Sequence, residues 1–362
     1  MATIYDVAKR AGVSPKTVSR VLNGDAPVAQ KTRDAVEAAM VELEYIPSIA
    51  ARSIKSQKSG LIGLITGAIS TATETPAHAG LPEINIVQGA QTVFESSGKT
   101  LLISDTGGKS ERVPHLIRTF RQHRVEGLLY VADHHKRVDL DIPQDAMKIV
   151  LVNCLDGHGT PSVLPDDESG QFALTRKVVS AGHRRLAYLT LGRTHLATQL
   201  RLKGFKAALG EAGIAHDPEL VASTDLFGTP GEHQLIWDAL DRFLRHDNPP
   251  TAICCGNDRL AMAVYGILRD RGVDVPDQIS VVGYDDHRLV SETLYPALTT
   301  AELPYTAMGA RAADLLLNMI AEPDVAAPAG PVLVSGQVVE RASLKPPAKT
   351  GHIYHLKGRK RP

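Results

Sequence analysis

The sequence of 362 residues has few cysteines, few aromatic residues and no long apolar run. Its three cysteines, Cys154, Cys254 and Cys255, form no CxxC pair, which excludes a disulfide framework or a cysteine zinc site and fits a reducing compartment. No run of 18 apolar residues is present to span a membrane, and the N-terminus lacks the apolar core of a signal peptide. We therefore expect a cytoplasmic protein with no membrane partner.

The common catalytic and cofactor-binding motifs are also missing. No GxGxxG motif follows an apolar run, no GxSxG motif supplies a hydrolase nucleophile, and no GxxxxGK[ST] motif supplies a phosphate loop. His134 and His135 are adjacent and cannot share one helix face as the ligands of an HExxH motif do, so we expect them in a solvated loop. The sequence predicts a protein that is not an enzyme and holds no metal or cofactor.

The charges are balanced overall but unevenly distributed. Forty basic side chains offset forty acidic ones. Residues 1–60 carry nine Lys/Arg against six Asp/Glu, whereas the remainder carries 31 against 34. A small basic head on a mildly acidic body differs from a neutral globule, and it keeps a nucleic-acid partner possible despite the zero net charge.

Two short helices are predicted within the first 24 residues. Thr3 can cap the first helix, with Asp6 completing an acidic capping box, and Gly12 should end it. Ser14 can cap the second, and Pro15 suits its first position because proline lacks the N–H that would go unpaired there. Only a tight turn fits between the two, which is typical of a helix-turn-helix.

The second helix, from Pro15 to about Leu22, has two unlike faces. Its apolar residues recur at the i, i+3 and i+4 spacing of an inward face. The opposite face is short, basic and free of carboxylates. It carries Lys16, Ser19, Arg20 and Asn23, with Thr17 on its flank. Such a face can enter the major groove of DNA, where Arg20 can donate to both acceptors of a guanine.

The rest of the chain divides into three further parts. A third helix near residues 30–43 completes a DNA-binding head of residues 1–47, and residues 48–60 form a linker that can make two helical turns. Residues 61–345 form the body. Residues 346–362 are a basic tail without heptads, which we expect to be disordered.

The body alternates apolar runs with helical patterns. Runs typical of strands buried in a parallel sheet lie at 61–66, 100–104, 127–131, 149–154, 186–191, 252–255 and 279–283. Helical patterns lie near 85–97, 110–123, 168–181, 199–212, 232–245, 258–271 and 305–320. The alternation predicts doubly wound parallel sheets, and the length of the body predicts two α/β lobes with a cleft between them.

Polar side chains follow several of these runs, at strand ends where α/β sheets collect ligand-binding groups. Asn153, Asn257 and Asp285 each end or follow a run, and Arg201 lies in the helix after the run at 186–191. Arginine donates, aspartate accepts and asparagine does both, which is what a polyol requires. Asp258 is expected to act only as a helix N-cap.

At this point the sequence resembles a known family. TIYDVAKRAGVSPKTVSRVLNG, followed by IPSIAARSIKSQKSGLIGLI, is similar to the start of a LacI/GalR-family transcriptional repressor. The similarity continues through GHRRLAYL, RLKGF, TAICCGND, ISVVGYDD and LTT to about residue 345. The resemblance implies a helix-turn-helix head, a hinge helix, a two-lobed body like that of the periplasmic sugar-binding proteins, and a homodimer on a near-palindromic double-stranded DNA operator.

The resemblance also implies roles for single residues. In the head, Thr17, Ser19 and Arg20 match positions that contact DNA, and Pro15 and Lys16 match positions where members differ in operator preference. Ile54 matches the hinge residue that wedges into the minor groove. In the body, the positions that match effector contacts are Arg201, Asn257, Asp285 and Asn153, with Leu226 or Phe227 on an apolar wall.

Departures from the family pattern leave the effector open. Residues 71–82 form an insertion without aromatics, Leu303 stands where a glutamine is common, and aromatics make up only 4% of the chain. A small carbohydrate-like effector is the main expectation, and a nucleobase or nucleoside is the alternative. Two competing functions are less favoured: a small-molecule sensor without DNA output, and an enzyme acting in the cleft.

Overall fold

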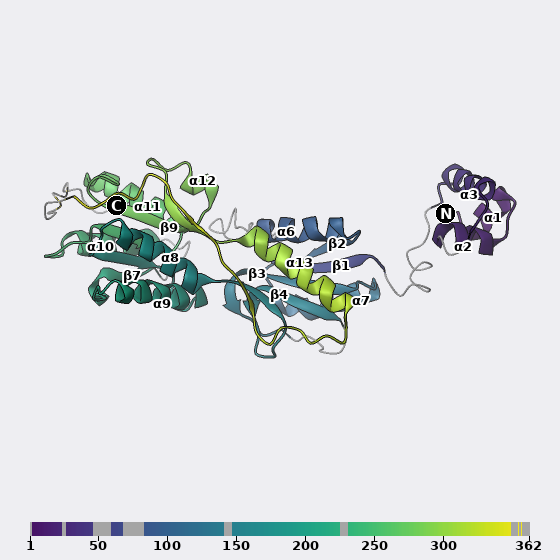
Figure 1. Cartoon of the computed structure of the whole chain (residues 1–362), viewed down its shortest axis with the longest axis horizontal. Helices are drawn as coiled ribbons and strands as arrows, with labels where there is room; N and C mark the ends of the chain where they lie inside the picture. The colour runs from purple at the N-terminus through teal and green to yellow at the C-terminus, as the bar shows by residue number, and fades with distance from the viewer. Residues whose placement is uncertain are drawn as a thin grey trace.

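The computed structural model describes residues 2–23, 27–45, 59–67, 83–140, 147–224, 231–348, 354 and 356. Its N-terminal head consists of α1 (Ile4–Ala11), α2 (Pro15–Asn23) and α3 (Gln30–Glu42), shown in purple in Figure 1. The three helices bury a small core that includes Val7, Val18 and Val36. The predicted helix-turn-helix is confirmed, and the residues that join it to the body lie outside the described part.

The capping residues of the head are those that the sequence predicts. The Thr3 hydroxyl accepts the Asp6 amide, while the Asp6 carboxylate accepts the Thr3 amide at 2.8 Å, so the capping box is complete. Gly12 ends α1 in the left-handed region at φ 64°. The Ser14 hydroxyl accepts the Thr17 amide at 3.1 Å and caps α2. These bonds hold the tight turn that fixes α2 against α1.

The first lobe contains a six-stranded parallel sheet in the order β11-β5-β4-β3-β1-β2. The strands are β1 (Leu61–Thr66), β2 (Thr100–Asp105), β3 (Gly127–Arg137), β4 (Lys148–Leu155), β5 (Ser162–Pro165) and β11 (Val332–Val334). Helices α6 (Glu83–Ser96), α7 (Val113–Gln122) and α13 (Tyr305–Ala321) cover the sheet, and η2 (Ser110–Arg112) precedes α7. Strand β3 runs six residues beyond the apolar run that predicts it.

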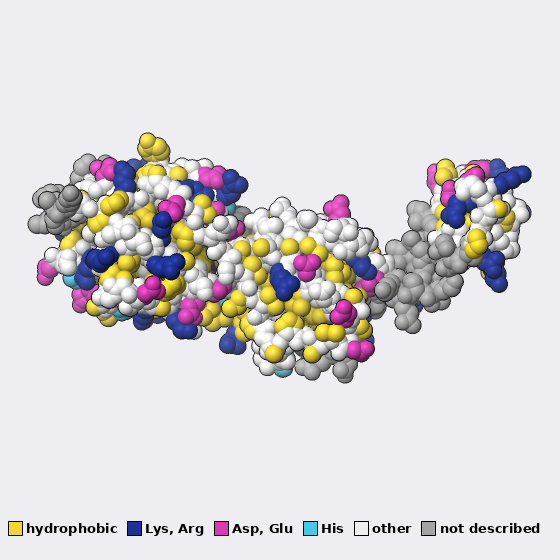
Figure 2. All heavy atoms as spheres, viewed as in Figure 1, with side chains coloured by type: hydrophobic (Ala, Val, Ile, Leu, Met, Phe, Trp, Pro, Cys, Tyr) yellow, Lys and Arg dark blue, Asp and Glu magenta, His cyan; other side chains and the backbone are white. Residues whose placement is uncertain are grey.

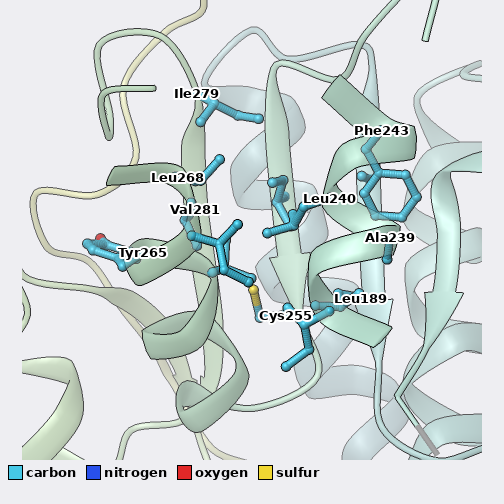
Figure 3. Packing of buried hydrophobic residues seen from close by; sticks show 14 of the residues in the cluster. Leu189, Ala239, Leu240, Phe243, Cys255, Tyr265, Leu268, Ile279 and Val281 are labelled. Atoms are coloured by element: carbon cyan, nitrogen blue, oxygen red, sulfur yellow. The ribbon is translucent and has the colours of Figure 1, made fainter. Parts of the chain in front are cut away.

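The second lobe contains the other sheet, in the order β12-β10-β9-β8-β6-β7, in which only β12 is antiparallel. Its strands are β6 (Leu186–Thr190), β7 (Val221–Ser223), β8 (Ala252–Cys255), β9 (Ser280–Asp285), β10 (Thr299–Glu302) and β12 (Val338–Val339). Its helices are α8 (Asp167–Ser180), α9 (Leu196–Glu211), η3 (Pro218–Leu220), α10 (Glu232–Leu244), α11 (Asp258–Arg271) and α12 (Arg288–Ser291). Figure 3 shows side chains of β6, β8 and β9 packed against α10 and α11. The predicted doubly wound, two-lobed α/β body is confirmed.

The chain passes between the lobes three times, after β5, after β10 and after β11 (Figure 1). The crossing segments are bonded to one another. The Asp166 amide donates to the Val334 carbonyl at 3.0 Å, and the Ser335 hydroxyl donates to the Asp166 carboxylate at 3.1 Å. The Glu302 amide donates to the Gln337 carbonyl at 2.8 Å. The three crossings therefore form one connected strip beside the cleft.

The prediction of a disordered tail after residue 345 is wrong at Tyr354. The Tyr354 side chain is only 7% exposed and belongs to the core of the second lobe, and Leu356 packs on the same core. The Tyr354 hydroxyl donates to the Pro250 carbonyl at 2.8 Å. Burial of one large aromatic group offsets the entropy cost of ordering a short extension, which a count of charges overlooks.

Two glycines allow α6 and α13 to cross in backbone contact. A Cβ atom at Gly89 would overlap the Thr306 carbonyl, and one at Gly309 would overlap the Ile86 carbonyl. Each glycine thus faces the backbone of the other helix. No side-chain adjustment can relieve such an overlap, so this contact fixes the distance between the two helices.

We predict that Gly309→Ala destabilises the protein by about 1–3 kcal/mol, because the added methyl group forces α13 away from α6. Denaturant unfolding followed by circular dichroism measures the change. Gly266→Ala is the matched control, since Gly266 lies in α11 with open space around its Cβ position. The control should be neutral or slightly stabilising, owing to the better helix propensity of alanine. Equal stability of the two variants would contradict the packing argument.

Candidate functional site

The α2 helix presents a basic surface without acidic neighbours on the helix itself. Lys16 and Arg20 are exposed, while Thr17 and Ser19 are half-buried beside them. The Thr17 hydroxyl lies 2.9 Å from that of Ser14, which couples this side chain to the helix cap. The arrangement matches the face predicted from the sequence, since these side chains lie one turn apart on an ordered helix.

Of three other predicted DNA contacts, the structure describes Pro15 completely, only the backbone of Asn23, and nothing of Ile54. Pro15 occupies the first position of α2, as its missing N–H favours. Asn23 is the last residue of α2, but its side chain lies outside the described part, and so does the whole of Ile54. Their roles stay predictions.

A cavity of about 260 Å³ lies between the two lobes. It is lined by Asp133, His134, His135, Asn153, Pro165, Leu191, His195, Ala197, Arg201, Asn257, Asp285, Leu303 and Tyr305. Residues from β3 and β4 of the first lobe thus meet residues from α9 and β9 and the N-cap residue of α11 in the second. Four predicted effector contacts, Asn153, Arg201, Asn257 and Asp285, come together here, whereas Leu226 and Phe227 lie outside the described residues.

A buried ionic network closes the back of this cavity. The Arg201 Nε donates to Asp167 Oδ1 at 2.6 Å, and its Nη1 donates to the Gly256 carbonyl at 2.5 Å. The other Asp167 oxygen lies 2.7 Å from His135 Nδ1. Although burial opposes ionisation, Arg201 and His135 hold the pKa of Asp167 below its usual value, and Asp167 in turn raises the pKa of Arg201.

Arg201 therefore has a structural role as well as a place in the cavity lining. Its guanidinium lies 3.7 Å above the Tyr284 ring, and its Nη1 lies 3.7 Å from the Asp285 carboxylate. Replacing it by alanine would leave Asp167 as a buried charge without its main partner, which is strongly destabilising. Loss of ligand binding in such a variant would not by itself identify Arg201 as a contact.

The two asparagines are each committed through one end of the amide. Asn153 donates one amide hydrogen to the Ala132 carbonyl at 3.2 Å, so it can offer a ligand its oxygen and its second N–H. Asn257 accepts the Leu260 amide at 2.8 Å and caps α11, so it can offer its nitrogen. Asp285 ends β9 with φ 114°, its side chain is about a quarter exposed and lines the cavity, and burial raises the pKa of its carboxyl group well above the usual value.

The prediction that Asp258 serves as an N-cap is wrong, because Asn257 caps the helix instead. Asp258 is fully buried inside the first turn of α11, where it accepts the Thr300 hydroxyl at 2.6 Å and the His287 amide at 2.8 Å. A Cβ atom at Gly283 would overlap its carboxylate, so glycine is needed in the neighbouring strand. Burial raises the pKa of Asp258 to about 7.

The expectation that His134 and His135 lie in a solvated loop is also wrong. Both belong to the extended end of β3, and His135 is only 5% exposed. His134 is half-exposed and stacks on His195 of the second lobe, with ring centroids 5.2 Å apart. The sequence analysis did not assign these histidines to the ligand site. They follow the apolar run 127–131, and the rule that polar residues after a strand lie at the ligand site, which identified Asn153 and Asp285, would have included them.

Among the described residues, no group of three His, Cys, Asp or Glu side chains is placed to hold a metal ion. Within the same part of the chain, no helix is long and apolar enough to cross a membrane.

Two protein-family models match parts of the chain. Residues 3–48 match the model for bacterial regulatory proteins of the lacI family, and residues 175–344 match that for a periplasmic binding protein-like domain. The HTH-type transcriptional regulator GalR of Escherichia coli (strain K12) is 33% identical over 350 residues, which cover 95% of this chain and 98% of that protein.

Two solved structures are similar over nearly the whole chain. The lac repressor dimer bound to operator and the anti-inducer ONPF is 27% identical, with a TM-score of 0.74 over 95% of this chain and 99% of that one. The complex of the transcriptional regulator CelR with cellobiose is 25% identical, with a TM-score of 0.57 over 95% and 100%.

The raised pKa of Asp258 predicts a pH-dependent stability. Between about pH 4 and pH 7 the folded protein keeps a proton on this residue that the unfolded chain has lost, so the free energy of unfolding falls as pH rises. We expect Asp258→Asn to remove this contribution, on the order of 2 kcal/mol between about pH 5 and pH 8. Urea unfolding at the two pH values measures it. Asp247→Asn, at an exposed position, should leave the wild-type difference unchanged, and an equal loss in both variants would contradict the assignment.

Proposed function

Because the chain belongs to the LacI family of bacterial regulatory proteins, we propose that it is a sequence-specific DNA-binding transcriptional repressor controlled by a small effector. The observation that carries the proposal is the basic face of α2, which is held by a complete capping system on a helix-turn-helix. Lys16 and Arg20 reach base edges in the major groove, while Thr17 and Ser19 contact bases or phosphates at its edge. Pro15 and Asn23 flank these contacts.

The parts of the chain divide this work. Residues 1–47 bind DNA, residues 48–60 form the hinge in which Ile54 wedges the minor groove, and residues 61–345 bind the effector and dimerise. Figure 2 shows charges of both signs scattered over the visible face of the two lobes, which favours the head rather than the body as the DNA contact. Effector binding shifts the equilibrium between operator-competent and incompetent forms by its different affinity for each, typically ~1–3 kcal/mol.

The effector site is the cavity between the lobes. Asn153, Arg201, Asn257 and Asp285 supply polar groups of both kinds there, and Leu226 or Phe227 supplies an apolar wall. A carbohydrate-like effector fits these groups, and a similar regulator forms a complex with cellobiose. Among the described residues of the lining, Tyr305 is the one Phe, Tyr or Trp side chain, which makes a stacked nucleobase the less favoured ligand.

Exposed apolar side chains support a homodimer. Leu289 in α12 is 77% exposed and Tyr295 just after it is 97% exposed, while Met262 is exposed on the adjoining α11. Apolar groups of this size that gather on neighbouring elements mark interaction surfaces in soluble proteins. A two-fold pair of heads then matches the two half-sites of a near-palindromic operator.

Arg20→Ala tests the DNA-binding proposal. We expect it to weaken operator binding by about 1–3 kcal/mol and to relax the preference at one base pair, because a bidentate contact is lost. The operator is first identified by selection from random duplexes, and affinity is then measured by fluorescence anisotropy at two salt concentrations. Lys31→Ala, on the exposed side of α3, removes the same charge elsewhere in the head. Wild-type affinity and base preference in Arg20→Ala would refute the assignment.

The dimer surface is tested with Leu289→Asp and Tyr295→Asp. Each places a carboxylate in an apolar contact, and we expect the double variant to sediment as a monomer at concentrations where the wild type is a dimer. Val325→Asp, which changes an exposed apolar residue after α13, is the control and should stay dimeric. Analytical ultracentrifugation distinguishes the two states, and a dimeric double variant would place the interface elsewhere.

A further inference from the structure

His135 presents an unpartnered buried nitrogen at the wall of the cavity. Its side chain is 4% exposed, and its Nδ1 lies 2.7 Å from Asp167 Oδ2. Its Nε2 is buried and has no hydrogen-bond partner among the residues that the structure describes. A buried polar atom without a partner is costly, so its occurrence at the lining of a cavity points to a ligand atom that completes it.

The environment of the ring defines what Nε2 can do. A carboxylate accepts only, so Nδ1 carries the proton that bonds to Asp167. The other oxygen of this carboxylate bonds to Arg201. An imidazole whose one hydrogen is on Nδ1 has a lone pair on Nε2, and that lone pair can accept a hydrogen bond.

The charges of the cavity lining favour an uncharged ligand. The lining includes the Asp133 carboxylate and one guanidinium, Arg201, which is already bonded to Asp167. Burial raises the pKa of Asp285 well above its usual value and so favours the neutral form of this side chain. Although burial opposes ionisation, His134 and Lys136 hold the pKa of Asp133 well below its usual value, so this group stays anionic. A carboxylated or phosphorylated ligand would meet the Asp133 anion, while the guanidinium of Arg201 is already bonded to Asp167.

We propose that His135 is a specificity-determining effector contact, which accepts a hydroxyl hydrogen from an uncharged monosaccharide or alditol and thereby disfavours sugar acids and sugar phosphates. This inference rests on the proposed assignment of the cavity to the effector. The Asn153 oxygen and the Asp285 carboxyl group accept further hydroxyls, and the Asn257 nitrogen donates to a ligand oxygen. A cavity of about 260 Å³ is smaller than the roughly 300–1,000 Å³ usual for ligand pockets, which suits one sugar unit.

Two substitutions separate the two nitrogens of His135. His135→Asn keeps an amide N–H near the position of Nδ1 and so keeps the bond to Asp167, but it removes the atom at Nε2. His135→Gln places an amide oxygen near Nε2 and gives up the Asp167 bond. For a neutral sugar that binds the wild type, we expect at least a tenfold loss of affinity in His135→Asn and a loss of less than about threefold in His135→Gln. The reverse order would assign the histidine a purely structural role and overturn the proposal.

Calorimetry with a defined panel tests the ligand class. The panel contains D-galactose, D-ribose, galactitol and ribitol, their acids D-galacturonate and D-ribonate, ribose 5-phosphate, and adenosine. We expect at least one neutral sugar or alditol to bind, and its acid or phosphate to bind at least tenfold more weakly. Binding confined to acids, phosphates or adenosine overturns the proposal, as does failure of all four neutral compounds at millimolar concentration.

A spectroscopic measurement tests the tautomer without any ligand. In ¹⁵N-histidine-labelled protein, we expect the His135 Nε2 resonance, assigned by its absence in His135→Asn, to have the chemical shift of an unprotonated nitrogen at neutral pH. A protonated Nε2 overturns the proposal. Operator binding is measured in parallel on both variants. If a sugar binds through His135 but operator affinity is absent or unaffected by the sugar, the regulatory proposal fails while the contact stands.

Discussion

The cleft depends on one buried carboxylate. Asp167, at the first turn of α8 in the second lobe, binds Arg201 of the same lobe through one oxygen and His135 of the first lobe through the other. Removing these charges from water costs several kcal/mol, which only well-placed partners can offset. The positions of α8, α9 and the end of β3 are therefore interdependent, and the bonds among His135, Asp167 and Arg201 help to set the shape of the cavity.

Backbone-level packing keeps each lobe rigid around this point. Gly204 of α9 faces the Glu168 carbonyl of α8, and Gly309 of α13 faces α6, at distances that leave no room for a Cβ atom. The chain connects the lobes through the crossing segments, which are bonded to one another through Asp166 and Gln337, and His135 and His134 of the first lobe contact Asp167 and His195 of the second. A ligand that binds one cleft geometry more tightly favours that geometry. Because each lobe is tightly packed, the lobe then moves as a whole about the crossing segments.

The sequence was most informative where a residue acts through its neighbours in the chain. The caps at Thr3 and Ser14 and the alternating strands and helices follow from local rules, since each hydrogen bond or apolar contact spans a few residues. Local patterns were insufficient where the environment comes from distant segments. The basic residues around Tyr354 predict a disordered tail, yet Tyr354 belongs to the core of the second lobe and its hydroxyl bonds to Pro250, 104 residues earlier in the chain.

By itself, the sequence determined the helix-turn-helix, the doubly wound class of the body, and the strand-end positions of Asn153, Asn257 and Asp285. Only the tertiary structure decided which of these groups share a cavity and which atom of each is left for a ligand. His135 shows the reason. Its chemistry is set by Asp167 and, through it, Arg201, which lie 32 and 66 residues further along the chain. Burial and the direction of a hydrogen bond are properties of the packed molecule, and no local pattern encodes them.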